Sequence, residues 1–175
     1  MLMEQLFESG VMTIDPERNV GIFRPEAVAG LSALRAGELA KFAWLTGEWR
    51  YENRVPATRC SPAYTDAGSC SFCERDGWIC LVSPDGAERR NITFDPLSRQ
   101  WIYILAQGSF GILRSAEGWV GDRIVFTGLM TMVGINCEWR MSWAKESDNS
   151  FAFVNEELGA DGAWHYIDEW QFARK

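Results

Sequence analysis

The chain has a single histidine, no excess of positive charge and no long apolar run. A net charge of −7 argues against binding to nucleic acid or to an anionic membrane, because both require a basic surface. No stretch approaches the roughly 20 apolar residues that cross a bilayer. Residues 1–8 also lack the basic start and the apolar block of a secretory signal. Neither nucleic acid nor a membrane is therefore expected as a partner.

The five cysteines are an odd number, and without a secretory signal they predict reduced thiols and a cytoplasmic location. Cys70 and Cys73 have the spacing of redox and zinc motifs, but positions i and i+3 of a strand point to opposite faces. A turn at Asp76-Gly77 places Cys73 opposite Cys80, either as a cross-strand disulfide or as reduced neighbours. We expect no metal site from these cysteines with Cys60, and no cofactor.

Aromatic residues are abundant, with nine Trp and ten Phe among 175 residues. They favour strands and supply large apolar walls, which suits a β core or an apolar cavity. Residues 1–30 are interpreted as an N-terminal extension and 31–175 as one domain. Pro25 is tolerated at the first position of a helix. Residues 32–42 favour a helix with one buried stripe formed by Leu31, Leu34, Leu39 and Phe42.

After Gly47 the hydrophobic pattern changes to a period of two. Turn signals such as Asp95-Pro96 and Gly121-Asp122 separate the runs, because Gly accepts a positive φ and Asp tolerates it. About ten short strands predict an all-β fold, an up-and-down antiparallel β-barrel that closes to remove its edges. The segment 55–68 is the one long loop, either a lid or a surface loop. The predicted strands span 47–54, 69–75, 78–83, 88–94, 100–106, 109–115, 119–127, 134–144, 150–157 and 163–173.

The register of the last hairpin follows from matching its apolar faces. The even residues of 163–173 form one aromatic face, and the odd residues of 150–157 share it. This register places His165 outward, opposite Glu156 and next to Glu169. The predicted pairs are Glu157 with Trp164, Asn155 with Tyr166, Phe153 with Asp168 and Phe151 with Trp170.

The inward faces of the last three strands form a predicted wall around a cavity. An apolar cavity with a few converging polar groups is the usual form of a small-molecule site. A carboxylate in such a wall requires hydrogen-bond partners. The wall consists of Trp139, Met141, Trp143, Phe151, Phe153, Tyr166 and Trp170, and it carries the polar groups Asn155, Glu157 and Asp168.

A second aromatic strand, 100–106, contributes Tyr103 to the candidate ligand-binding residues. With Gln107-Gly108 as a two-residue turn, Trp101 lies opposite Arg114. That pair is either a cation on a ring face or a surface pair. If it faces inward, Arg114 is the best candidate to receive a ligand carboxylate.

Four functions remain open at this point. The first is binding of a small hydrophobic or aromatic ligand, with Trp139, Tyr166 and Trp170 as walls and Asn155 and Asp168 as polar anchors. The second is an enzyme in which Asp168 acts as general acid or base beside Tyr166. A haem or gas sensor is the third, and the fourth is a barrel whose interior is filled by its own side chains.

The Gly47-Glu48-Trp49 sequence after a short helix, with Arg174 at the end of the last strand, resembles the calycin signature of lipocalins and fatty-acid-binding proteins. The resemblance implies that Trp49 packs across one end of the barrel against Arg174. Three further motifs resemble a bacterial lipocalin-like family of unknown function. They are Phe94-Asp95-Pro96, Phe126-Thr127-Gly128 and Asp161-Gly162-Ala163-Trp164.

The resemblance covers about residues 40–175 and leaves the N-terminal extension outside. That extension either caps the barrel or crosses to a second subunit, so a homodimer is one option. Related barrels include the haem-binding nitrobindins, which use a histidine late in the chain. His165 is late, but its predicted outward direction argues against that role.

Overall fold

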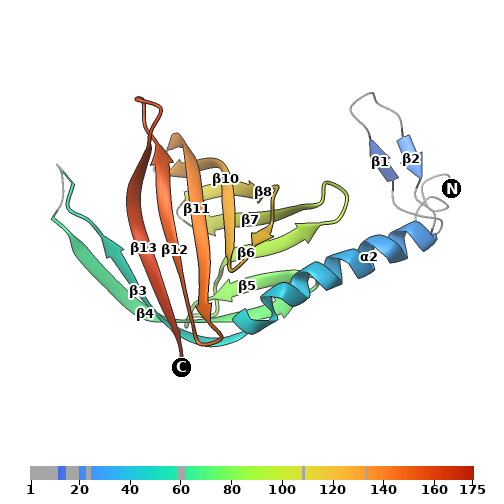
Figure 1. Ribbon diagram of the computed structural model, residues 1–175, viewed down its shortest axis with the longest axis horizontal. Coiled ribbons are helices and arrows are strands. Elements are labelled where there is room, and N and C mark those ends of the chain that lie inside the picture. The colour runs from blue at the N-terminus through green and yellow to red at the C-terminus, as the bar shows by residue number, and fades with distance from the viewer. Residues whose placement is uncertain (1–11, 15–19, 23–24, 59–61, 108, 133) are drawn as a thin grey trace.

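The computed structural model describes residues 12–14, 20–22, 25–58, 62–107, 109–132 and 134–175. Ten antiparallel strands form a closed barrel, as predicted, because β10 pairs with β11 and β13 pairs with β3 (Figure 1). A short strand, β9 (Trp119–Val120), pairs with β10. The barrel strands are β3 (Gly47–Val55), β4 (Tyr64–Arg75), β5 (Trp78–Val82), β6 (Glu88–Asp95), β7 (Gln100–Gln107), β8 (Ser109–Ser115), β10 (Arg123–Met132), β11 (Ile135–Ser147), β12 (Ser150–Leu158) and β13 (Trp164–Arg174).

Two predicted boundaries are wrong. The span 119–127 is not one strand, because the turn at Gly121-Asp122 separates β9 from β10, which continues to Met132. The predicted loop 55–68 is shorter, because β4 begins at Tyr64 and pairs with β3 from there. The segment 59–61 of that loop lies outside the described residues.

The chain before the barrel forms a small hairpin and a helix. Strands β1 (Met12–Ile14) and β2 (Val20–Ile22) form a separate two-stranded sheet at the N-terminal end of the helix (Figure 1). Helix α2 (Pro25–Leu39) begins at Pro25 and continues into the 3₁₀ helix η1 (Ala40–Leu45). No described helix has the length and apolar character that would let it span a membrane.

The predicted buried stripe holds only at the end nearest the barrel. Leu39 and Phe42 are buried, but Leu34 is 36% exposed because most of α2 extends beyond the sheet (Figure 1). Helix η1 lies across one end of the barrel, where the Phe42 ring packs 4.7 Å from Trp101 and 4.9 Å from Trp119. We call this the closed end.

Arg174 fixes the closed end to the last strand. Its guanidinium lies 4.5 Å from the centre of the Trp49 ring, so the contact implied by the resemblance is present. It also donates to the carbonyls of Thr46 (3.0 Å) and Trp44, while the Trp49 indole donates to the Leu45 carbonyl (2.7 Å). These bonds satisfy carbonyls at the end of η1 that have no partner within the helix.

Gly47 makes this arrangement possible for two reasons. Its φ of +127° is a conformation that L side chains rarely adopt. A Cβ at this position would also lie only 2.7 Å from Nη1 of Arg174. The spacing of Gly47 and Trp49 therefore reflects the packing of the arginine against both the backbone and the ring.

Replacing Gly128 by alanine should destabilise the barrel. A Cβ there would overlap the backbone carbonyl of Ile112 on the neighbouring strand, and a backbone atom cannot rotate away. We expect the free energy of unfolding to fall by about 2 kcal/mol, the usual cost of an overpacked site. Urea denaturation measures this change.

Gly37→Ala is the matched control, because nothing lies within 4 Å of a Cβ at that helical position. It should raise the free energy of unfolding by about 0.5–1 kcal/mol, since alanine favours a helix over glycine. An equal change in the free energy of unfolding for the two variants would contradict this prediction. It would show that β8 and β10 leave room for a side chain at position 128.

Candidate functional site

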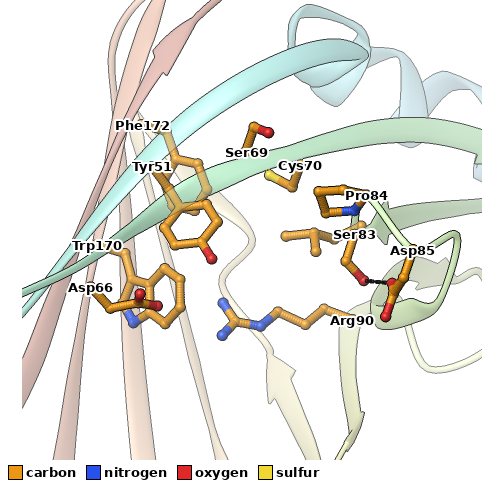
Figure 2. Close-up of a pocket in the computed structure, with 11 residues that line it drawn as sticks. Tyr51, Asp66, Ser69, Cys70, Ser83, Pro84, Asp85, Arg90, Trp170 and Phe172 are labelled. Carbon is orange, nitrogen blue, oxygen red and sulfur yellow. Dashed lines mark hydrogen bonds between the residues drawn. The ribbon is translucent and has the colours of Figure 1, made fainter.

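The other end of the barrel contains a pocket of about 500 Å³ (Figure 2). We call this the open end, because η1 lies at the opposite end, where β3 begins and β13 ends. Residues Ser83–Asp85 of the β5–β6 turn form part of its rim. The lining residues that carry the argument are Tyr51, Asp66, Cys70, Arg90, Trp170 and Phe172.

One wall of the pocket is aromatic. The Tyr51 ring lies 5.1 Å from Trp170, and Trp170 stacks on Phe172 at 6.2 Å and 17°. Tyr51 lies across its partner Gly68 on β4, where a Cβ would be 2.6 Å from the tyrosine hydroxyl. The glycine thus leaves room for the ring to lie flat against the barrel wall.

Arg90 extends from β6 into this pocket, with its guanidinium directed toward Tyr51 and Trp170 (Figure 2). Its Cζ lies 4.4 Å from the centre of the Trp170 ring and 5.3 Å from that of Phe153. Such contacts attract a cation through the negative face of the ring. Arg90 therefore provides a positive charge beside the aromatic wall of the pocket.

The charge of Arg90 reaches two other buried groups. Burial raises the pKa of the Cys70 thiol to about 11, and the positive charge of Arg90 acts in the opposite direction. Burial likewise raises the pKa of the Tyr103 phenol, again opposed by Arg90. Both groups are therefore neutral at pH 7, and Cys70 presents a thiol rather than a nucleophilic thiolate.

Four of the predicted site residues form one hydrogen-bonded chain that includes Trp170 of the aromatic wall. The Trp139 indole donates to Oδ1 of Asn155 (3.0 Å), whose Nδ2 donates to Oδ1 of Asp168 (2.6 Å). The Trp170 indole donates to the other oxygen, Oδ2 of Asp168 (3.1 Å). The chain fixes the orientation of Trp170, the residue on which Arg90 stacks.

Side chains fill the interior below the pocket. Trp143 stacks on Phe151 at 5.4 Å and on Phe153 at 5.2 Å. Met141 and Tyr103, both predicted as ligand-binding residues, are 2% exposed and belong to this core. The predicted alternative of a filled barrel thus describes the part toward the closed end, whereas the open end keeps its pocket.

The predicted inward position of Tyr166 is wrong. Tyr166 pairs with Glu156 and is 46% exposed, so it lies on the outer face, away from Asp168. The cause is a β-bulge in β13, which leaves Ile167 without a partner and shifts the register by one residue. The predicted catalytic pair of Asp168 and Tyr166 is therefore not formed.

Beyond the bulge the predicted faces hold, although the partners differ. Asn155 lies opposite Asp168 instead of Tyr166, and Phe153 lies opposite Trp170 instead of Asp168. Phe151 lies opposite Phe172 in the same way. The predicted faces of β11 and β12 are also correct.

His165 lies at the rim of the open end. It pairs with Glu157 rather than with the predicted Glu156. Its Nε2 lies 2.9 Å from Oδ1 of Asp161 in the β12–β13 turn, and this hydrogen bond raises the pKa of the imidazole. The predicted neighbour Glu169 is not its partner. The predicted outward direction of His165 is wrong, because the bulge turns it to the inward face that Glu157 shares with Asn155. The side chain is 52% exposed and bonded to the turn, so it does not enter the aromatic core.

The predicted pairing of Trp101 with Arg114 is also wrong. Trp101 pairs with Ser115, and the register of β7 and β8 differs by one residue from the expected one. Arg114 is exposed on the outer face and lies opposite Ile102. It cannot receive a ligand inside the barrel, and Arg90 is the inward cation instead.

The cysteines follow the expected faces. Cys70 points inward and is buried, whereas Cys73 lies on the outer face directly opposite Cys80. Cys73 is a free thiol. Among the residues that the structure describes, no cluster of three or more His, Cys, Asp or Glu side chains could hold a metal ion. Cys60, which completed the four-cysteine alternative, lies outside the described residues.

Sequence reasoning missed Arg90 and Tyr51, although their strands were predicted. Arg90 shares the inward face of Ile92 and Phe94, and Tyr51 shares that of Trp49. Alternation in steps of two from these large apolar residues predicts both positions.

No protein-family model matches the chain, and neither does the sequence of any curated protein. Among solved structures, the chain is similar to the crystal structure of Rv2717c from M. tuberculosis. The two share 9% sequence identity with a TM-score of 0.53, over 79% of this chain and 97% of the other. At this identity the similarity shows a common barrel fold.

Proposed function

We propose that the barrel binds a small, largely apolar ligand in the pocket at its open end. The observation that carries the proposal is the combination of a closed end sealed by η1 with an aromatic-walled pocket of about 500 Å³ at the opposite end. Pockets of 300–1,000 Å³ with apolar walls and few polar groups are typical small-molecule sites.

The wall residues support an apolar ligand because each presents a ring face or an aliphatic side chain. Tyr51 and Trp170 are only partly covered by other residues, and the buried Phe172 also lines the pocket. A ligand that buries them gains about 25 cal/mol for each Å² of apolar surface removed from water.

We also propose that the chain is a lipocalin-like barrel of the calycin type. Gly47, Trp49 and Arg174 support this assignment, because the arginine stacks on the tryptophan and binds the carbonyls of the adjacent 3₁₀ helix. The assignment does not depend on the ligand.

Gly68→Val should weaken binding of a neutral fluorescent probe, N-phenyl-1-naphthylamine. The new side chain would occupy the space of the Tyr51 ring and push it into the pocket. Loss of about 50 Å² of apolar contact corresponds to about a tenfold lower affinity. Titration of probe emission against wild type and variant measures it.

Ala67→Val is the matched control, because Ala67 is exposed on the outer face of the same strand. It should bind the probe like wild type. Absence of probe binding to the wild-type protein, or an equal loss in both variants, would contradict a ligand site at this pocket.

A further inference from the structure

Arg90 has hydrogen-bond donors that no described residue uses. Its interactions within the described part of the chain are the two ring contacts, with Trp170 and Phe153, and electrostatic effects on Tyr103 and Cys70. A guanidinium stacked on a ring still directs its five N–H groups outward in its own plane. The Arg90 guanidinium itself lies in the pocket (Figure 2), where its N–H groups can reach a ligand.

The carboxylate that contacts the Trp170 indole is occupied by other donors. Asp168 accepts a hydrogen bond from Asn155 on one oxygen and from the Trp170 indole on the other. Asn155 is held in turn by Trp139. Both oxygens of Asp168 thus have donors, and among the described residues Asp168 forms no ion pair with Arg90. The guanidinium is thus kept available for an acceptor that arrives with the ligand.

The geometry points to a planar aromatic monocarboxylate as the ligand, with its acid group bound by Arg90 and its ring packed against Tyr51 and Trp170. This inference rests on the proposed function and specifies the ligand class of the same pocket. A guanidinium binds a carboxylate through two parallel hydrogen bonds. One inward arginine matches one negative charge.

The walls favour an aromatic body over an alkyl chain. Tyr51, Trp170 and Phe172 form a continuous series of rings, with Trp170 and Phe172 nearly parallel. A planar ligand extends such a series through offset stacking, which adds to the gain from burial alone. A flexible chain would lose rotational freedom on binding without that gain.

The surrounding carboxylates limit the ligand to a single charge. Asp66 and Asp85 line the pocket, and Asp168 accepts a hydrogen bond from the Trp170 indole of its wall. Asp85 is engaged in its own turn, where it accepts from the Ser83 hydroxyl and the Ala87 amide. A second negative charge on the ligand would face these groups, and the described residues that line the pocket include no second cation to bind it.

Calorimetric titration with three probes tests the inference at pH 7. They are 2-naphthoate, the neutral 2-naphthalenemethanol and the saturated acid decanoate. We expect 2-naphthoate to bind about 10- to 100-fold more tightly than the alcohol, the usual value of a charged hydrogen-bonded pair. It should also bind more tightly than decanoate. In Arg90→Met, which keeps the stem over Trp170, the acid should lose its advantage over the alcohol.

The outcomes separate the two proposals. If the alcohol binds to the wild-type protein as tightly as the acid, or decanoate as tightly as 2-naphthoate, the assigned ligand class is wrong while the apolar pocket stands. An acid preference that survives in Arg90→Met would also overturn it. If none of the three probes binds, both proposals fail. If Arg90→Met does not fold, the relative affinities of the three probes for the wild-type protein still decide whether the assigned ligand class is correct.

Discussion

Arg174→Met should lower the free energy of unfolding by about 3 kcal/mol, which corresponds to roughly 6–12 °C in Tm for a chain of this size. The variant keeps an apolar stem but loses the donors to the Trp44 and Thr46 carbonyls and the charge over Trp49. The carbonyls at the end of η1 would then lack their partner, and the closed end would loosen. Thermal unfolding followed by far-ultraviolet circular dichroism measures the change.

Lys175→Met is the control for loss of a positive charge at the same end of the strand. Lys175 forms an exposed ion pair with Glu48 at 3.5 Å, and such pairs contribute about 0–1 kcal/mol. Arg174→Lys should recover only part of the lost stability. An ammonium group keeps the positive charge, but it lacks the planar guanidinium geometry that donates to two carbonyls at once. Equal effects of the two methionine variants would show that Arg174 acts only as a surface charge.

The closed end was the part of the molecule most accessible to sequence reasoning. Gly47, Trp49 and Arg174 form a recognisable pattern because they pack together. Arg174 lies over the Trp49 ring and so close to Gly47 that a side chain would not fit there. The strands were also predictable, because glycine and aspartate turns separate runs with a period of two. The face of each residue follows from that period within one uninterrupted strand.

The register between strands was less accessible, because it depends on single residues in turns and bulges. The bulge at Ile167 moves Tyr166 to the outer face while leaving Asp168 and Trp170 inward. A one-residue difference at the β7–β8 turn likewise turns Arg114 outward. Neither shift follows from the alternation of apolar and polar residues, because that pattern fixes the face within a strand and not the partner across it.

Asn155→Leu should abolish most of the preference for an aromatic acid. Leucine has a similar size but cannot donate to Asp168, whose Oδ1 would lose its partner. We expect the carboxylate to turn toward Arg90, which stacks on the same Trp170 indole that Asp168 accepts from. An internal ion pair would compete with the ligand, so affinity for 2-naphthoate should fall about tenfold or more, the value of one charged hydrogen bond.

The neutral 2-naphthalenemethanol is the internal control, because its affinity does not depend on the donors of Arg90 and should stay near the wild-type value. The double variant Asn155→Leu/Asp168→Leu should restore binding of the acid, since it removes the competing carboxylate. An equal loss for acid and alcohol would instead mean that Asn155 only supports the shape of the wall. Unchanged binding of 2-naphthoate would show that Arg90 stays available to the ligand without the hydrogen bonds that link Trp139, Asn155 and Asp168.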